Sequence, residues 1–550
     1  MTTPPPFDTH RVENQPPPFE PADLWTGDRA LREAVAREGG DWAQTELSAY
    51  GRICGDEIYR LGFDANRDRP RLVTHDRFGH RIDRVEFHPA YHRIMQLGVE
   101  HGVSNFAWRH ERPGAQVARA ALTLMHHQAE AGSNCPLTMT AAAVPVLRRE
   151  AALAEWASKA IAPHYDSHDV PMADKAGVTI GMGMTEKQGG SDVRSNTSVA
   201  TPLPADGAYS IVGHKWFLSA PMCDAFLVLA QAPGGLTCFL LPRWCPDGTR
   251  NALRLMRLKD KVGNWSNASS EVEFTGAFAQ RIGAEGKGVA TIIEMVALTR
   301  LDCALGAAAE MRMALAQALH HARHRRAFGR RLIEQPLMMN VLTDIAIESE
   351  AATALALRIA RAVDAAPREP AEAAFARAAT AIGKYWLTKR AVPVVNEAQE
   401  CLGGAGYVED SIMGRLYREA PLNSIWEGCG NIQCLDVLRA IERDAGTREA
   451  LFAEIEGAAG LDEALEEEVE ALTLGFSQRS GIELRARFLV ERLALALQSS
   501  VLLHAAAKDR SLLPVAAAFC RSRLDSGRGL AFGTLEDSVD FDAIIARVLP

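Results

Sequence analysis

The sequence predicts a mainly helical fold with a central β domain and an additional helical domain at the C-terminus. Segments before residue 178 repeat apolar residues at three- and four-residue spacing, the period of an amphipathic helix. Short β-rich runs broken by Gly, Pro and Asp follow between about 180 and 285. Long helical patterns then return and continue through the last hundred residues. We find no internal repeat.

These changes of period predict four domains. Residues 1–180 comprise an extended arm and a helical domain, with helical patterns in RALREAVAREGGDW, QVARAALTLMHHQAEAG and RREAALAEWASKAI. Residues 181–288 form the β domain, with strands in GAYSIVGHKWFLSA, DAFLVLAQA, LTCFLLPR and SSEVEFTG. Residues 289–445 form a helical bundle interrupted at FGRR and LGGAGY. Residues 446–550 form a further helical domain.

Composition and charge limit the class of protein. The chain has 550 residues, 47% of them hydrophobic, enough for several sizeable cores. Its 60 Lys and Arg against 69 Asp and Glu give a net charge of -9, which argues against a general polyanion binder but allows a local basic patch. The ten cysteines show no C-x-x-C pair and no metal-ligand spacing. We therefore expect reduced, mostly buried thiols, a cytoplasmic location and no metal.

The N-terminal segment, MTTPPPFDTHRVENQPPPFEP, is rich in proline and has no apolar core, so it is unlike a secretory signal. We find no run of about 18 apolar residues and expect no membrane span. The proline-rich segment is expected to lie extended along the surface or against a neighbouring subunit.

NSIWEGCGN places one acid, Glu427, between a tryptophan and two glycines, just before the apolar helical run IQCLDVLRAI. A carboxylate beside Ile425 and Trp426 is costly to bury unless something pairs or uses it. One interpretation is a helix-start acid stabilised by the amide dipoles. The other is a general base whose pKa is raised by apolar surroundings. These nine residues alone favour the first interpretation.

Three further segments carry groups suited to ligand binding. GMGMTEKQGGSDV combines Gly189 and Gly190 with the hydroxyls of Thr185 and Ser191, a loop that suits a phosphate or a polar heterocycle edge as well as an ordinary turn. GHKWFLS should place its two aromatics on opposite faces of a strand, one in the core and one available to cover a flat ligand, although two packing aromatics are an alternative. HHARHRRAFGRR gathers arginines that can bind phosphate, form a solvated helix end, or contact nucleic acid.

Together these segments resemble the acyl-CoA dehydrogenase flavoproteins. MTEKQGGSD is similar to the family's T-E-x-x-x-G-S-D loop, GHKWFLS to its G-x-K-x-W/F-I-T strand and RRAFG to R-x-x-F-G. LGGAGY is similar to the G-G-x-G-Y/F turn, and RLYREAPLNSIWEG to R-D-A…I-Y-E-G. NQPPP, EAGSNCPLTMT, LKDKVGNWSNASSEVEF and NIQCLDVLR extend the resemblance over nearly the whole chain to the AidB-like, alkylation-response branch of the family.

The resemblance implies a fold of N-terminal helical domain, central β domain and four-helix bundle, with FAD between the last two. Thr185, Gly190 and Ser191 match the loop that holds the flavin, Phe217 the aromatic on one flavin face and Ser219 the hydroxyl near N5. Arg325 matches an arginine that reaches the FAD pyrophosphate of a neighbouring subunit, which implies a homotetramer. The remaining cofactor-binding candidates on these motifs are Met182, Met184, Trp216, Gly403, Gly404, Gly428 and Asn431.

Glu427 matches the family's catalytic base, which removes the acyl α-proton while FAD takes the β-hydride. Some members of the family carry the base on a bundle helix instead. The matching position here is Thr299, which is not a carboxylate, so Glu427 is the expected base. Four positions depart from the pattern, and they concern substrate turnover more than FAD binding. Glu400 stands three residues before Gly403, where the common pattern has a flavin-contacting Gln, and Cys429 replaces the usual Thr or Ser after E-G. Trp265 occupies a place where relatives have Arg, and Gln335 falls one position earlier than the usual Gln.

The C-terminal tail has an acidic start, EIEGAAGLDEALEEEVE, followed between 479 and 528 by a region richer in arginine. Such a region can form a phosphate-binding face or simply solvated helices. The resemblance favours binding of duplex DNA, with Arg439 and Arg528 as the matching positions. Arg521 and Arg523 of the arginine-rich region are further candidates. With no base-reading motif, that binding should tolerate any sequence and weaken with salt.

Two functions follow as expectations. The first is an FAD-dependent dehydrogenase that uses Glu427 on a short or branched acyl-CoA. The alternative is a DNA-binding flavoprotein of the alkylation-damage response with weak or vestigial dehydrogenase activity.

Overall fold

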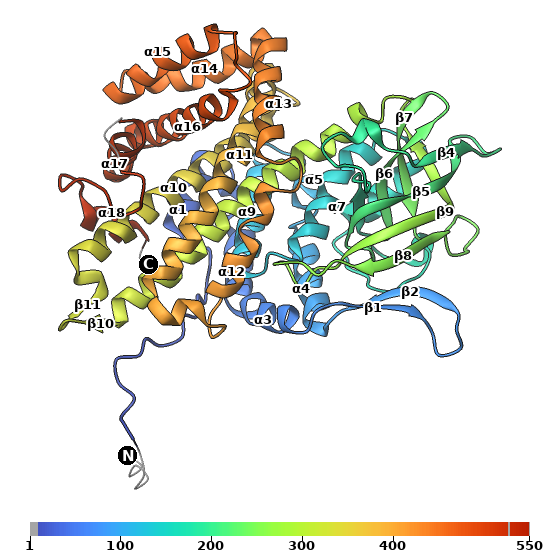
Figure 1. Ribbon diagram of the computed structural model, residues 1–550, viewed down its shortest axis with the longest axis horizontal. Coiled ribbons are helices and arrows are strands. Elements are labelled where there is room, and N and C mark those ends of the chain that lie inside the picture. Colours follow the sequence, from blue (N-terminus) through green and yellow to red (C-terminus); the bar gives the residue numbers. More distant parts are fainter. Residues whose placement is uncertain (1–8, 526–528, 549–550) are drawn as a thin grey trace.

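The computed structural model describes residues 9–525 and 529–548. A helical bundle lies at the centre, with the β domain on one side and the C-terminal helices on the other (Figure 1). This is the fold class that the sequence predicted.

The N-terminal helical domain contains one β-hairpin that the periodicity missed. Its helices are α1 (Arg29–Arg37), α2 (Gln44–Ile53), α3 (Tyr59–Arg67), α4 (Pro89–Glu100), α5 (Phe106–Arg109), α6 (Ala115–Ala129), α7 (Asn134–Leu147) and α8 (Ala154–Ile161). The hairpin consists of β1 (Arg71–His75) and β2 (Arg81–Glu86), paired antiparallel. Its turn is set by Gly79, at φ +87, and by Asp76, whose carboxylate accepts from the Phe78 and His80 amides at 2.8 and 2.9 Å. The expectation of continuous helix was therefore wrong here.

The β domain is a closed sheet. Its strands are β3 (Ile180–Gly183), β4 (Val199–Pro202), β5 (Ala208–Ser219), β6 (Ala225–Ala232), β7 (Gly235–Pro242), β8 (Leu253–Leu258) and β9 (Ser269–Ile282). The pairings β4–β5, β5–β9, β9–β7, β7–β6 and β6–β4 form a ring, while β3 adds to β6 and β8 to β9. Closure leaves the ring without an unpaired edge.

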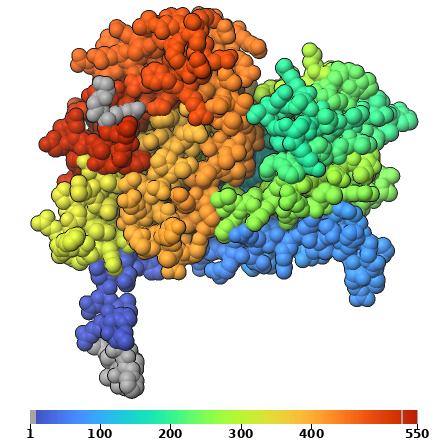
Figure 2. Space-filling model, viewed as in Figure 1, coloured from blue at the N-terminus to red at the C-terminus, as the bar shows by residue number. Residues whose placement is uncertain are grey.

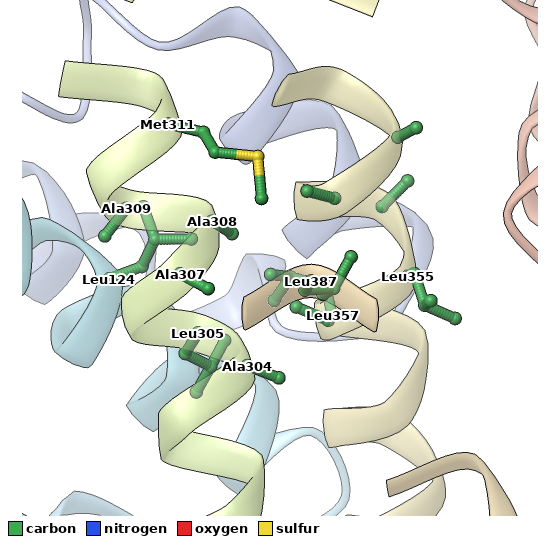
Figure 3. Close-up of a cluster of buried hydrophobic side chains, with 14 of the residues drawn as sticks. Leu124, Ala304, Leu305, Ala307, Ala308, Ala309, Met311, Leu355, Leu357 and Leu387 are labelled. Atoms are coloured by element: carbon green, nitrogen blue, oxygen red, sulfur yellow. The ribbon is translucent and has the colours of Figure 1, made fainter. Parts of the chain in front are cut away.

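The bundle consists of α9 (Gly288–His324), α10 (Pro336–Ala365), α11 (Pro370–Cys401) and α13 (Gly430–Arg443), with the short α12 (Met413–Glu419) before α13. Proline at the first position of α10 and α11 suits a helix start, because the missing N–H would have no helical partner there. Figure 3 shows the core, in which small side chains of α9, such as Ala304 and Ala307, face Leu355, Leu357 and Leu387. Small residues on α9 allow its neighbours to approach closely.

The C-terminal helices are α14 (Ala445–Ala459), α15 (Glu463–Ser477), α16 (Ala486–Lys508), α17 (Leu513–Leu524) and α18 (Phe541–Val548). Among the described helices, α16 alone has the length and apolar composition of a membrane span, but 78% of its most apolar window is buried in the protein. Ion pairs to α10 dock this domain: Arg523 pairs with Asp344 and Glu348, and Arg547 with Glu350.

The proline-rich arm contacts the end of α9 in the same chain. Asn14 accepts from the Arg325 guanidinium at 2.6 Å through its carbonyl, and its side chain exchanges hydrogen bonds with the Arg326 backbone. The Pro17 carbonyl bonds His320 at 2.8 Å. The start of the described chain projects from the body of the molecule (Figure 2), and residues 1–8 lie outside the described residues.

Candidate functional site

Glu427 lies just before α13, beside α9 and α11. Its carboxylate accepts a hydrogen bond from the hydroxyl of Thr299 on α9 at 2.8 Å. Its backbone is left-handed, with φ +57, and Gly428 follows at φ +95. A non-glycine residue in this region costs about 1–3 kcal/mol and persists only where its surroundings hold it.

Three side chains hold this backbone through successive carbonyls. Lys384 of α11 donates to the carbonyls of Trp426 and Gly428 at 2.8 and 2.6 Å. Arg300 of α9 donates to the Glu427 carbonyl at 3.1 Å, and Gln433 of α13 to the carbonyls of Glu427 and Gly428 at 3.0 and 2.9 Å. Because the donors come from different helices, the bundle itself fixes the direction of the Glu427 side chain.

The surroundings of Glu427 balance two opposing effects on its pKa. Burial raises it above the ordinary value, and the Thr299 hydrogen bond and the charges of Lys384 and Arg300 lower it again, leaving a net increase. The side chain is half-buried, so a substrate can still reach it. A carboxylate with a raised pKa is a stronger base than an ordinary one. The interpretation of Glu427 as a simple helix-start acid does not account for this setting.

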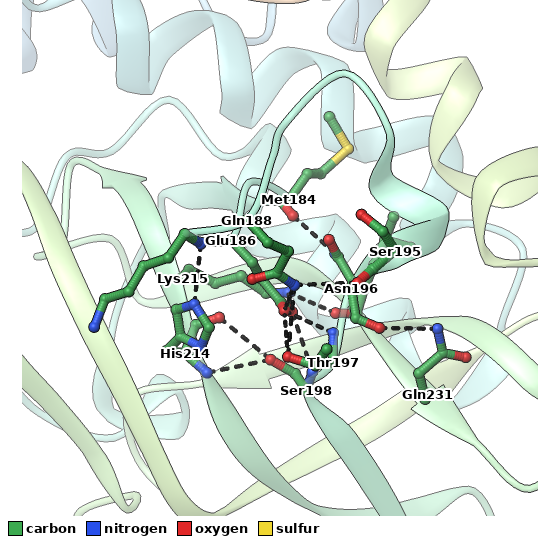
Figure 4. Close-up of polar contacts among 12 residues, drawn as sticks. Met184, Glu186, Gln188, Ser195, Asn196, Thr197, Ser198, His214, Lys215 and Gln231 are labelled. Atoms are coloured by element: carbon green, nitrogen blue, oxygen red, sulfur yellow. Dashed lines mark hydrogen bonds and ion pairs between the residues drawn. The ribbon is translucent and has the colours of Figure 1, made fainter.

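The glycine-rich loop after β3 is anchored by a buried ion pair that the sequence analysis did not single out. Glu186 and Lys215 are both fully buried, with the ammonium 2.7 Å from the carboxylate (Figure 4). Glu186 also accepts from the amides of Thr197 and Ser198 at 2.7 and 3.3 Å. Burial raises the pKa of Glu186, but Lys215 and these hydrogen bonds hold it down at about 2. Glu186 lies in MTEKQGGSD and Lys215 in GHKWFLS, two segments with motifs similar to those of flavoproteins. An acid in one motif and a single strand lysine in the other were the sequence signal that could have revealed the pair.

The loop brings the predicted flavin residues beside β5. The Trp216 amide donates to the Thr185 carbonyl at 2.8 Å. A Cβ added at Gly190 would lie 2.7 Å from the Thr185 hydroxyl, so only glycine fits this close approach. Met182 and Met184 are half-buried on and after β3, and Ser191 is exposed.

A β-bulge changes the expected directions of the two aromatics on β5. The pairing of β5 with β9 shifts between Lys215 and Leu218, and it is these two side chains that are buried. Trp216 is half-buried and Phe217 is 47% exposed, so neither enters the core, and the predicted alternation was wrong. Bulges commonly redirect side chains beside active sites. Phe217 is thereby left partly exposed, with the Lys259 ammonium 4.6 Å from its ring centre.

Ser219 at the end of β5 lies 3.2 Å from Ser269, oxygen to oxygen. Burial raises the pKa of the nearby Cys135 thiol, and the charge of Glu427 contributes to the same increase while Ser219 lowers it. Cys135 is therefore near both Ser219 and Glu427. At the start of α13, Asn431 is exposed and accepts from Arg487 of α16 at 2.8 Å, which links the C-terminal domain to this site.

Arg325, Gly403 and Gly404 lie far along their helices from the residues that surround Glu427. Thr299 lies about a third of the way along α9 and Arg325 just beyond the end of that helix, about 39 Å apart at 1.5 Å per residue. Gly403 and Gly404 follow the end of α11, about 28 Å along that helix from Lys384. Phe328 and Tyr407 beside them are 99% and 88% exposed. One chain therefore does not bring all the predicted cofactor residues together.

Of the four residues that depart from the family pattern, two make contacts with their neighbours and two are exposed. Trp265 is stacked between the guanidinium groups of Arg69 and Arg418, 3.4 and 4.1 Å from its ring centre. Gln335 donates to the Ala327 carbonyl at 3.0 Å. Glu400 and Cys429 are exposed.

The DNA-binding candidates have different environments. Arg439 and Arg521 are exposed. Arg523 is only 8% exposed and its guanidinium is paired with two carboxylates of α10, so it is not positioned to contact a phosphate, and this prediction is corrected. Arg528 lies outside the described residues. Elsewhere in the tail Arg492 pairs with Glu468 and Arg479 with Glu442, which further reduces the basic surface.

Comparison with known proteins agrees with this geometry. A family model for the N-terminal domain of adaptive response protein AidB matches residues 14–167, and models for the middle and C-terminal domains of acyl-CoA dehydrogenases match 181–277 and 286–442. The AidB protein of Escherichia coli, whose name places it among the acyl-CoA dehydrogenases, is 51% identical over 458 residues, covering 82% of this chain and 84% of that protein. Acyl-CoA dehydrogenase family member 11 of Caenorhabditis elegans is 30% identical, covering 84% of this chain and 77% of that protein.

Solved structures give the same assignment. The C. elegans ACDH-11 structure in complex with C11-CoA has a TM-score of 0.84 at 25% identity and covers 99% of both chains. Butyryl-CoA dehydrogenase from Megasphaera elsdenii, with a TM-score of 0.58 at 20% identity over 73% of this chain and 98% of that one, shares the fold. The chain therefore belongs to the acyl-CoA dehydrogenase family, in its AidB-like branch.

Proposed function

We propose that the protein is an FAD-dependent acyl-CoA dehydrogenase in which Glu427 removes the α-proton of a short or branched acyl-CoA. The observation that carries this proposal is the half-buried Glu427 carboxylate, held in a fixed direction by a strained backbone and bonded to Thr299 at 2.8 Å. The complex of the ACDH-11 relative with C11-CoA supports an acyl-CoA as substrate.

The residues around Glu427 define its part in the reaction. FAD, when bound, supplies the acceptor for the hydride that leaves the β-carbon. One oxygen of the Glu427 carboxylate takes the α-proton, and the electron pair of the broken C–H bond becomes part of the new α,β double bond. The Thr299 hydroxyl holds the other oxygen. Within the described residues the Glu427 amide donates to no acceptor, so it is free to bind the thioester oxygen and stabilise the charge that develops there.

The residues present fit a flavin. Phe217 and Ser219 lie two residues apart on β5, and the loop with the Thr185–Gly190 contact is joined to this strand by the hydrogen bond from the Trp216 amide to the Thr185 carbonyl. Thr185, Gly190, Ser191, Phe217 and Ser219 would hold the ring and its ribityl chain.

A homotetramer forms part of the proposal. Arg325, Gly403 and Gly404 lie too far along α9 and α11 to serve the site around Glu427 of their own chain. In an oligomer they would complete a neighbour's cofactor site, and the exposed Phe328 and Tyr407 would be covered. The buried state of most cysteines agrees with the cytoplasmic location that we propose.

The test is anaerobic titration of the purified flavoprotein with a panel of acyl-CoAs, isovaleryl-CoA included. Bleaching of the flavin absorbance by at least one of them is expected, and its loss in Glu427→Gln would assign the proton transfer to Glu427. No bleaching with any acyl-CoA would overturn the proposed activity.

Binding of duplex DNA through the C-terminal domain is the second candidate function. The exposed Arg439 and Arg521 support it, and the internal pairing of Arg523 and Arg492 weakens it. The measurement is affinity for duplex DNA at low salt, with and without residues 446–550. Salt-sensitive binding that depends on these residues is expected, and affinity that is absent or unaffected by their removal would exclude it.

A further inference from the structure

Lys384 is a buried cation without a carboxylate partner among the described residues. Its ammonium lies inside the bundle on α11 and is fully buried by its neighbours. Its hydrogen bonds go to two backbone carbonyls, those of Trp426 and Gly428, at 2.8 and 2.6 Å. Burying an ammonium is unfavourable, and carbonyl dipoles offset that cost only in part. The arrangement therefore calls for a reason beyond packing.

The two carbonyls flank the base. Since Lys384 binds the carbonyls of the residues before and after Glu427, a change in the left-handed backbone at Glu427 should break one of its hydrogen bonds. Arg300 and Gln433 bind the carbonyl of Glu427 itself, but neither spans it on both sides. Lys384 is thus the side chain whose contacts are most sensitive to the backbone direction of Glu427.

The charge of Lys384 also acts differently from that of Arg300. The Arg300 guanidinium is paired with Asp436 at 2.7 Å, and Asp436 is paired in turn with Arg377. Within the described part of the chain Lys384 has no carboxylate at ion-pair distance, although the charge of Glu427 acts on it. The titratable groups that act on it are Cys303 and Arg300 of α9, Cys429 before α13 and Glu427 itself.

We propose that Lys384 is the positioning residue of the base: its ammonium clamps the carbonyls on both sides of Glu427, holds the carboxylate towards Thr299, and favours its ionised form. This inference rests on the proposed function for its kinetic consequence, but its structural consequence does not depend on activity.

The test compares Lys384→Met, which removes the charge and both hydrogen bonds at similar length, with Lys384→Arg, which keeps a charged donor. Lys389→Met is the matched control, because Lys389 lies on the same helix and donates to none of the three carbonyls. Each full-length flavoprotein is examined for flavin content, for acyl-CoA dissociation constant, and for the pH dependence of flavin bleaching.

In Lys384→Met, bleaching should slow by about 100-fold, as expected for a misplaced catalytic group. The pH at which the rate rises should move upwards, because Glu427 loses a stabilising charge. Lys384→Arg should keep the wild-type pH midpoint, and Lys389→Met should match the wild type in both. A folded, flavin-loaded Lys384→Met with unchanged rate and midpoint would overturn the proposal. Should Lys384→Met not fold, Lys384→Gln, which keeps a neutral donor but no charge, takes its place: an upward shift of its midpoint would support the proposal and an unshifted midpoint would overturn it.

A crystal structure of Lys384→Met separates this inference from the proposed function. Loss of the positive φ at Glu427 or of the Thr299–Glu427 hydrogen bond supports the positioning role, even if no acyl-CoA bleaches the wild type. Retention of both contradicts it.

Discussion

The buried Glu186–Lys215 pair allows a quantitative test of how the flavin-type loop is held. In Lys215→Met, Glu186 keeps its buried position but loses its cation at 2.7 Å. Breaking a buried pair by removing one partner costs about 3–5 kcal/mol. Glu186 also accepts from the amides of Thr197 and Ser198. The substitution should therefore mainly lower the free energy of local opening of residues 184–198.

Hydrogen exchange of the amides in residues 184–198 is the assay. An opening free energy lower by about 3–5 kcal/mol speeds exchange by more than about a hundredfold. The double variant Glu186→Gln, Lys215→Met should recover most of the protection, because no unpaired buried charge remains. Lys187→Met, at an exposed position in the same loop, is the control. Equal protection in Lys215→Met and the wild type would refute the assigned role of the pair.

Three further predictions concern stability. Leu387→Ala in the bundle core should lower the free energy of unfolding by about 2–5 kcal/mol, and Leu474→Ala at an exposed position by less than about 0.5 kcal/mol, as measured by urea denaturation. Burial raises the pKa of Glu419 to about 7, so its contribution to stability is complete below about pH 4.5 and is lost as pH rises through 7; Glu419→Gln should remove this part of the pH dependence in thermal melts. Arg523→Ala should loosen the C-terminal helices, seen as faster proteolysis there, while Arg521→Ala should leave them intact; equal proteolysis of the two would contradict the packing role of Arg523.

The order of helical, β and helical segments was predictable because the spacing of apolar residues in each segment can be recognised within a short stretch of sequence. The β1–β2 hairpin was missed because its strands are short and lie between strongly helical segments. The turn at Gly79, with Asp76 before it, was the local signal that favours a hairpin.

The position of Glu427 just before a helix was predictable from its motif, but the contacts that hold it there were not. The carbonyls of residues 426–428 are held by Arg300 of α9 and Lys384 of α11, which lie far away in sequence, and by the nearby Gln433 of α13. No local pattern encodes such contacts. Likewise, the bulge on β5 arises from the pairing with β9, so the directions of Trp216 and Phe217 could not be derived from alternation alone.

Charge counts over the tail failed for a related reason. They treat every arginine as exposed, whereas Arg523 and Arg492 are paired with acids on other helices. Which arginines remain at the surface depends on how the C-terminal helices pack against each other and on α10, and this is a tertiary property.

The most direct test of the central claim compares flavin bleaching by acyl-CoAs in the wild type and in Glu427→Gln, with Glu449→Gln at an exposed position on α14 as control. We expect at least one acyl-CoA to bleach the flavin in the wild type and in Glu449→Gln. In Glu427→Gln the flavin should stay oxidised although the ligand still binds. Bleaching at the same rate in Glu427→Gln would contradict the account, because another group would then take the α-proton.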